Sequence, residues 1–578
     1  MHNGVQLEKM WKGGPMGLAM STPVDEMDGP YKKRWAALVV LCLSLLIIVM
    51  ANTSLTVAAP DMVKDLGLGS SDLQWVIDAY TVPYAALMLI LGAVGDKYSR
   101  RGALVLGLFV FGAASVAGSL VDSSAGVITA RAVMGVGAAM IMPATLSLLA
   151  ATFPREERAK AITIWTATAG LAIAVGPLVA GALLEDHGWS STFLINVPIA
   201  VLGIIGALLL VPPSKAGRTG DDAKIDYIGG LLSVLWVGSL IYMIIEGPHF
   251  GWGTGPIVAA VLAGAGLIAF VLWELRHPRP VLDVRRFAQR AFAGSTLAVA
   301  LFFLAVFGAF YYLTQYLQFV LGYSPLDTGI RMLPLAGTVF VGGALTALLT
   351  PKVGMKATVA LGMTVGTVAI ALLTRVDANS TYDDFLLPLM ILGLAIGLSL
   401  SPCTNAIMGS FPEDQLGVGG AVNSTSIEMG GSLGIAILGT VLANSYSDNL
   451  SDAARKVAAG GGPKLPADAL STAQDSVGAG LAVAKEVGKQ VAAGAAPKVG
   501  QEKAAAMGAQ QAQTVVEAVH KAFADAVAHT SVIGAVVLGA GTVLVAFLLP
   551  RRPKPEAAEA PAEAGGEPEA AKKSGERV

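Results

Sequence analysis

Three ionisable residues stand inside long apolar stretches of this 578-residue chain, where a charge is hardest to accommodate. Asp78 lies in QWVIDAYTVPYAALMLILG, Arg131 in ITARAVMGVGAAM and Glu428 in NSTSIEMGGSLGIAILG. A charged side chain in the middle of a bilayer costs about 3 kcal/mol or more unless it is paired, hydrated or neutralised by a proton. We therefore expect Asp78 and Glu428 to bind protons or cations, and Arg131 to pair with a carboxylate or with backbone carbonyl groups. The alternatives are a hydrated outer-end carboxylate at Asp78 and structural interhelical bonds at Glu428 and Arg131.

The apolar stretches around these residues are long enough to cross a bilayer as helices. Hydrophobic residues make up 54% of the chain and charged residues only 14%, which is too little charge for the surface of a soluble fold. The sequence therefore predicts an all-α polytopic membrane protein with fourteen transmembrane helices. We place them near residues 36–58, 74–95, 103–121, 127–150, 161–183, 193–211, 228–245, 256–274, 291–319, 329–350, 357–374, 385–409, 418–442 and 530–549.

Lysine and arginine residues gather in every second loop, which predicts the orientation of the chain, because positive loops stay in the cytoplasm. Both termini are then expected to be cytoplasmic. We predict a cytoplasmic N-terminal segment, an N-terminal six-helix bundle, two additional helices with their linkers, a C-terminal six-helix bundle and a disordered cytoplasmic tail. These regions comprise residues 1–33, 34–211, 212–290, 291–550 and 551–578, respectively. Within the C-terminal bundle, residues 443–528 predict an external helical hairpin, with a partly disordered linker as the alternative.

The remaining residues argue against several kinds of chemistry. Cys42 and Cys403 lie in separate apolar runs, the six histidines have no zinc-site spacing, and no GxxxxGK[ST] loop is present. Charge is sorted by side of the membrane and not clustered, so no nucleic-acid partner is implied. We expect a protein that is not an enzyme, holds no metal or cofactor and takes its energy from a source other than its own hydrolysis of ATP.

The loop between the second and third spans reads GAVGDKYSRR from Gly92 to Arg101. Asp96 in this loop could bind backbone N–H groups at the start of a neighbouring helix together with Arg100 or Arg101, and so hold two bundles together. The alternative is an arginine-rich orientation anchor. Glycine spacing in the fifth span, at Gly170, Gly176 and Gly181, permits close helix packing, and Pro177 permits bending.

The loop, read as GxxxDKxxRR, resembles the signature loop of the major facilitator superfamily of secondary transporters. Arg131 resembles that family's proton-relay arginine, and Gly170, Gly176, Pro177 and Gly181 resemble its antiporter motif. The segment Trp189–Pro198, WSSTFLINVP, is similar to a loop of the fourteen-span drug:proton antiporters, and the second span is most similar to the quaternary ammonium and multidrug exporters of the QacA type.

This resemblance implies the major facilitator fold, with two six-helix bundles plus two extra helices. It also implies proton-coupled efflux of lipophilic and quaternary ammonium cations across the bacterial plasma membrane by a monomer whose partners are drugs, protons and membrane lipids. Asp78 and Glu428 would couple proton and cation, Arg131 would relay protons, and Gly92, Asp96, Arg100 and Arg101 would gate the cytoplasmic side. Candidate substrate-cavity residues are Asn52, Trp75, Tyr80, Phe307, Tyr311 and Asn423.

Two departures from such exporters affect the expected substrate. Ala51 stands where an acid is usual in the first span, and Asn423 and Ser424 occupy positions that are often acidic. Fewer acids neutralise less positive charge, so we expect a preference for monovalent cations. Export of a specific metabolite, antibiotic or envelope lipid is the alternative on the same fold. An intramembrane enzyme or a receptor would be an alternative of another class.

Overall fold

The structure, a computed structural model, describes residues 30–66, 70–184, 186–214, 226–250, 252–459 and 465–550, and every regular element in these ranges is a helix. The predicted segments 1–29 and 551–578 lie outside the described residues. The bundle helices are α2 (Arg34–Leu66), α3 (Ser70–Tyr98), α4 (Arg100–Ser119), α5 (Ser124–Thr152), α6 (Arg155–Leu184), α8 (Asn196–Leu210), α11 (Arg290–Gln315), α12 (Pro325–Val353), α13 (Met355–Leu372), α14 (Tyr382–Gly409), α15 (Leu416–Ala459) and α18 (Gln501–Leu548).

Thirteen helical segments in the described part of the chain are long and apolar enough to cross a membrane. The remaining predicted span, near residues 161–183, corresponds to α6, a continuous helix of 30 residues whose Val175–Leu184 end is apolar. The fourteen predicted spans therefore match fourteen helices in the same order, and the predicted all-α membrane fold is confirmed.

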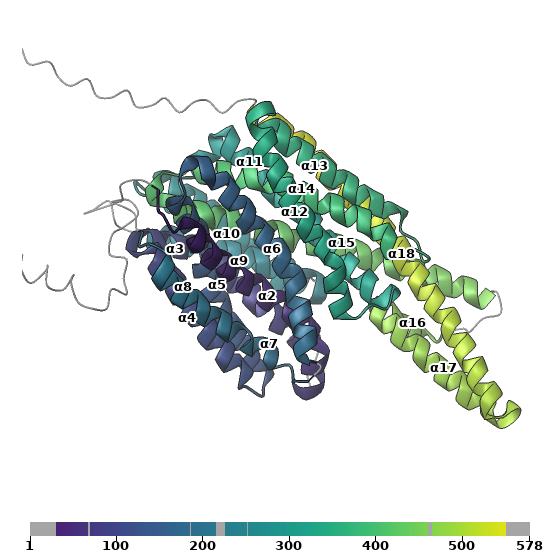
Figure 1. Ribbon diagram of the computed structural model, residues 1–578. Coiled ribbons are helices and arrows are strands. Elements are labelled where there is room, and N and C mark those ends of the chain that lie inside the picture. The colour runs from purple at the N-terminus through teal and green to yellow at the C-terminus, as the bar shows by residue number, and fades with distance from the viewer. Residues whose placement is uncertain are drawn as a thin grey trace, which may run out of the picture.

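The first six bundle helices and the last six form two groups that lie side by side (Figure 1). The groups meet where α12 and α14 pack on α6, and where α15 packs on α3 and α5. At the second contact, a Cβ on Gly92 would lie 2.7 Å from the backbone oxygen of Gly417, so no larger residue fits there without a shift. The exact division into an N-terminal bundle, two additional helices and a C-terminal bundle, at residues 34–211, 212–290 and 291–550, stays a prediction.

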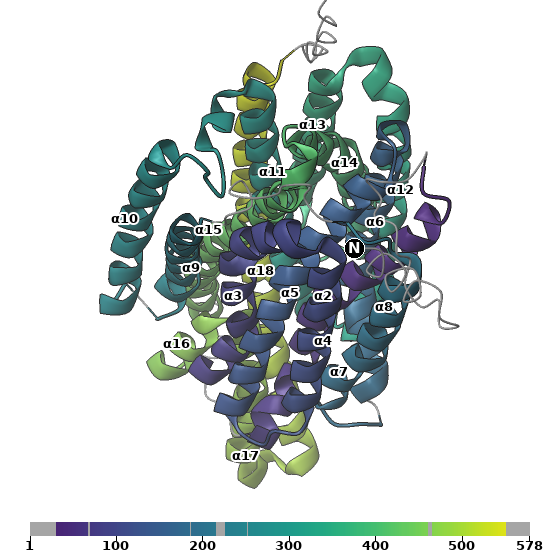
Figure 2. The same ribbon diagram turned by 90° about the vertical axis from the view of Figure 1, so that its left-hand side faces the viewer.

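Two further helices, α9 (Tyr227–Phe250) and α10 (Thr254–Arg276), stand between the groups in the sequence. In space, α9 packs on α3 and α15, and α10 packs on α9 at the edge of the molecule (Figure 2). Both helices are almost wholly apolar, because lipid or protein surrounds each of them on every side.

The helices α15 and α18 are far longer than a bilayer requires, at 44 and 48 residues. Their outer parts continue with α16 (Ala467–Asp475) and α17 (Val477–Val499) into an extension away from the bundle (Figure 1). The apolar core of the bundle continues into the extension, where Tyr446, Val477, Val519 and Phe523 are buried. Packing of this kind stabilises helices whose composition is too polar for lipid.

Candidate substrate and proton site

Arg131 on α5 is fully buried, with 0% of its surface exposed. Its guanidinium donates hydrogen bonds to the carbonyl oxygens of Val76 (3.1 Å) and Ala51 (3.4 Å) and to Asn52 Oδ1 (3.1 Å). The same group lies 4.5 Å from the centre of the Tyr80 ring, which adds a cation–π attraction. Arg131 thus connects α5 to both α2 and α3 while keeping its positive charge.

Asp78 on α3 is buried and acts electrostatically on Arg131. It follows Val76, whose carbonyl binds the guanidinium, by two residues. A carboxylate so near a buried cation has a counter-charge for its ionised form. When the carboxylate takes up a proton, this attraction is lost, so Asp78 and Arg131 form a pair whose strength depends on protonation.

Glu428 on α15 keeps part of its surface exposed, and its carboxyl group interacts with the hydroxyl group of Tyr84 on α3. Tyr84 stacks on Tyr80, with ring centres 5.4 Å apart and ring planes at 25°. Tyr80 is the ring over which Arg131 lies. A continuous run of polar and aromatic side chains therefore leads from the acid in the second helix group to the acid in the first, in the order Glu428, Tyr84, Tyr80, Arg131, Asp78.

Tyr84 was missed in the sequence analysis, although a signal for it exists. It follows Tyr80 by four residues on α3, and residues four apart share one face of a helix. An aromatic residue in a membrane span has many packing uses, so this spacing alone did not separate it from the others.

The other candidate cavity residues lie in different surroundings. Trp75 packs against Tyr242 of α9, with ring centres 5.8 Å apart. Phe307 lies against Gly431, less than one helical turn beyond Glu428, whereas Tyr311 is 38% exposed beside Gly439. Asn423 is fully buried and accepts a hydrogen bond from the hydroxyl group of Thr404 at 3.0 Å. The structure thus gathers Asn52 and Tyr80 around Arg131 and places Phe307 near Glu428.

The glycines of α6 mark a close helix contact. A Cβ on Gly176 would lie 1.9 Å from Thr53 Oγ1 and 3.1 Å from the Met50 carbonyl oxygen, so α6 touches the backbone of α2 there. Gly181 faces Leu326 of α12 at an ordinary 3.4 Å. Gly170 and Pro177 both lie inside the helix, where the missing N–H of proline removes one helical hydrogen bond.

Gly176→Val is expected to lower export several-fold and to reduce thermal stability, because the added methyl groups must push α2 and α6 apart at a cost of about 1–3 kcal/mol. Ethidium efflux from cells and thermal unfolding of the purified protein measure the two effects. Gly181→Ala, which has room for its methyl group, is the matched control and should match the wild type. If Gly176→Val also matches the wild type, close packing at this position has no role.

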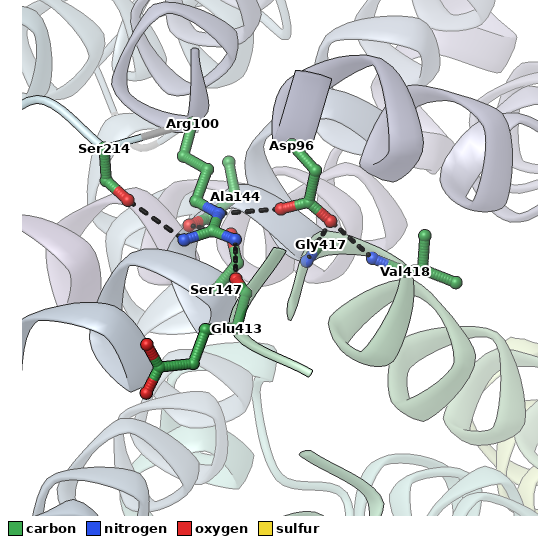
Figure 3. A network of polar contacts seen from close by, with 8 residues as sticks. All are labelled: Asp96, Arg100, Ala144, Ser147, Ser214, Glu413, Gly417 and Val418. Atoms are coloured by element: carbon green, nitrogen blue, oxygen red, sulfur yellow. Dashed lines mark hydrogen bonds and ion pairs between the residues drawn. The ribbon is translucent and has the colours of Figure 1, made fainter. Parts of the chain in front are cut away.

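The junction between the end of α3 and the start of α4 holds the two helix groups together (Figure 3). Asp96 is buried and accepts hydrogen bonds from Arg100 Nε (2.7 Å) and from the backbone N–H groups of Gly417 (2.6 Å) and Val418 (3.2 Å). Gly417 and Val418 begin α15, where free N–H groups and the helix dipole favour an anion. We call this cluster of Asp96, Arg100, Gly417 and Val418 the latch.

Arg100 and Arg101 make further hydrogen bonds next to the latch. Arg100 also donates to Ser214 Oγ (3.0 Å) and to the carbonyl oxygen of Glu413, and Arg101 donates to the Val211 carbonyl oxygen at 3.2 Å. Gly92 brings α3 against α15 one turn before the latch. Gly92, Asp96, Arg100 and Arg101, the residues that the resemblance assigned to gating, therefore lie together. They are at one end of the contact between the helix groups, and this end is closed in the structure.

On the same side, Arg34 binds Glu157 of α6 through two hydrogen bonds, of 2.6 and 2.9 Å. This side-chain hydrogen bonding holds the pKa of Glu157 below its ordinary value. Both groups are partly exposed, so the pair contributes little to stability. Among the residues that the structure describes, no group of three or more histidine, cysteine or acidic side chains is arranged to hold a metal ion.

Comparison with known proteins agrees with this architecture. The sequence model of the Major Facilitator Superfamily matches residues 41–435. The puromycin resistance protein of Streptomyces alboniger is 35% identical over 440 residues, which cover 75% of this chain and 87% of that protein. The methyl viologen resistance protein of Salmonella typhimurium is 30% identical over 457 residues, which cover 79% of this chain and 90% of that protein.

A solved structure shares the fold. A bacterial homologue of the human lysosomal transporter Spinster, in an inward-facing and unoccupied conformation, is 17% identical, with a TM-score of 0.54 over 91% of this chain and all of that one. The chain is a multi-pass membrane transporter and not an enzyme. It belongs to the Major Facilitator Superfamily, and its relatives place it among the drug-resistance transporters of that family.

Proposed function

We propose that this protein is a proton-coupled antiporter that exports lipophilic and quaternary ammonium cations across the bacterial plasma membrane. The observation that supports the proposal is the run from Glu428 through Tyr84, Tyr80 and Arg131 to Asp78, because it connects an acid of the second helix group with an acid of the first. One carboxylate cannot hold a proton and a cation together, so each ligand excludes the other.

In the proposed cycle, a cation enters from the cytoplasm or the inner leaflet and associates with ionised Glu428 or Asp78. Phe307, beside Glu428, supplies an aromatic face for the cation, worth about 0.5–2 kcal/mol. The helix groups then rock, and protons from outside displace the cation. In this account, the latch closes the cytoplasmic side while the cation leaves, and both chain termini are cytoplasmic.

Arg131 has the role of a positioning group in this cycle. Its hydrogen bonds to α2 and α3 go to two carbonyl oxygen atoms and an amide oxygen atom, which do not titrate. The attraction between Arg131 and Asp78 does change when Asp78 takes up a proton. Proton uptake by Asp78 therefore shifts the balance between two arrangements of α3 and α5, and no cofactor is required.

The relatives support cation export to different degrees. Methyl viologen, named for one relative, is a flat organic dication, which agrees with recognition of cations by acids and aromatic rings. The neutral residues at Ala51 and Asn423 lead us to expect that this protein, working as a monomer, prefers monovalent cations. The second candidate function is export of one particular antibiotic, which the relative named for puromycin resistance favours.

Ethidium efflux tests the proposal. Cells that express the protein should expel ethidium faster than control cells, and a protonophore should remove the difference. Measuring puromycin efflux in the same cells separates the two candidate functions. A dedicated antibiotic exporter would export puromycin but leave ethidium efflux at the control rate. Efflux that persists in the presence of the protonophore would contradict proton coupling.

A further inference from the structure

Two buried acids outside the proposed transport site meet where α9 and α10 approach the linker to α11. Asp226 directly precedes α9 and is 7% exposed, and Glu274 in the last turn of α10 is 0% exposed. A Cβ on Gly229 would lie 2.5 Å from Glu274 Oε1 and 2.7 Å from Asp226 Oδ2. Carboxylate oxygens from the end of α10 and from the residue before α9 therefore converge on one point.

The two acids differ in how their oxygen atoms are satisfied. Asp226 Oδ1 accepts a hydrogen bond from the Gly229 N–H at 2.9 Å, and Oδ2 accepts one from Trp273 Nε1 at 2.8 Å. Glu274 Oε2 accepts one from the Leu282 N–H at 3.3 Å, whereas Oε1 has no hydrogen-bond partner among the described residues. The unpartnered oxygen is the one on the Asp226 side.

The charged groups around Glu274 do not neutralise it. Asp226 and Asp283 act on it electrostatically, and both are acidic. His277 Nδ1 lies 3.4 Å from Asp226 Oδ2 and accepts from the backbone N–H of Arg279. Arg285 is mostly exposed and turns to Asp283 and the Leu275 carbonyl oxygen, and Arg276 is exposed. A buried carboxylate that faces other acids and leaves one oxygen atom without a hydrogen bond is strongly disfavoured in its ionised form, and taking up a proton removes that cost.

We propose that Asp226 and Glu274 together bind one proton, carried on Glu274 and shared toward Asp226, at a site separate from Asp78 and Glu428. The proton satisfies Glu274 Oε1 and removes the repulsion between the two acids. No other chemical step is involved, since the proton comes from water and returns to it.

The segment between α10 and α11 connects this proton site to the latch. Glu274 binds Leu282, and the next residues form the short helix η3 (Val284–Ala288). Arg286 in η3 donates hydrogen bonds to the Ser410 carbonyl oxygen and to Gln415 Oε1. The loop between α14 and α15 that Arg286 holds also carries Glu413, whose carbonyl oxygen binds Arg100 of the latch. Loss of the proton would restore the repulsion between Glu274 and Asp226 and so strain the contact between the end of α10 and the start of α9.

Infrared pH-difference spectroscopy of the purified, lipid-reconstituted protein tests the proposal directly. The starting protein carries Asp78→Asn and Glu428→Gln, so that the transport acids do not contribute. We expect a protonated-carboxyl band at neutral pH that disappears on adding Glu274→Gln and shifts in frequency on adding Asp226→Asn. Asp383→Asn, at an exposed acid in the first turn of α14, is the control and should leave the band unchanged.

A spectrum that keeps every protonated-carboxyl band in Glu274→Gln would overturn the proposal, as would a band that follows His277→Asn instead. Asp226→Asn provides a second variant if Glu274→Gln folds poorly, because the band must then move without disappearing. The readout does not require transport, so a protein that failed the efflux test would still give a decisive result here.

Discussion

Glu428→Gln is expected to reduce ethidium efflux to the level of cells without the transporter. Glutamine keeps the size and the hydrogen-bonding capacity toward Tyr84 but cannot be ionised, so it neither attracts a cation nor exchanges a proton. Loss of one partner from a desolvated charge pair costs about 2–5 kcal/mol, which corresponds to at least about a thirtyfold weaker affinity for the cation. Efflux rates in energised cells, normalised to the amount of protein in the membrane, measure the effect.

Glu502→Gln is the control for this variant. Glu502 is an exposed acid on the outer part of α18, far along the chain from the proposed site, and its loss should leave efflux unchanged. Asp78→Asn should also impair efflux, because Asp78 is the counter-charge of Arg131. Full activity in both Glu428→Gln and Asp78→Asn would exclude the acids as the coupling groups.

Asp96→Asn is expected to abolish export and to open the side of the protein that the latch closes. The change leaves Arg100 buried without its anion and weakens the bonds to the N–H groups of Gly417 and Val418. Breaking a buried ion pair in this way costs about 3–5 kcal/mol. Spin labels placed at the ends of α4 and α14 on the latch side should report a longer mean distance in the variant than in the wild type.

Asp327→Asn is the matched control for the latch. Asp327 also pairs with an arginine four residues later, Arg331, but the pair is exposed and lies within one helix. We expect this variant to show the spin-label distances and the efflux rate of the wild type. If both variants show the same distances, then the latch does not hold the closed state.

The spans could be predicted from the sequence, because lipid demands about twenty apolar residues for each crossing and the chain supplies them fourteen times. The ends of α15 and α18 could not. Residues 443–528 were expected to form a separate external hairpin, whereas α15 and α18 continue from the bundle into this region and α17 packs against α18. A drop in hydrophobicity marks the edge of the lipid but not the end of a helix.

The acids of the proposed site could be found from the sequence for a simple reason, since an ionisable residue within a span is costly and therefore conspicuous. Tyr84 could not be found in the same way, because its role depends on Glu428 lying across the contact between the helix groups. Asp226 and Glu274 were missed because acids near span ends are usually hydrated, and only the fold shows that these two are buried.

Competition between a proton and a cation for one carboxylate can be measured as proton release from the purified protein. Tetraphenylphosphonium added to weakly buffered wild-type protein should release protons, detected with a pH-sensitive dye, because the cation displaces H⁺ from Glu428 or Asp78. The variant with both Glu428→Gln and Asp78→Asn should release none. Cation binding without any proton release by the wild type would contradict competition of the two ligands for one carboxylate.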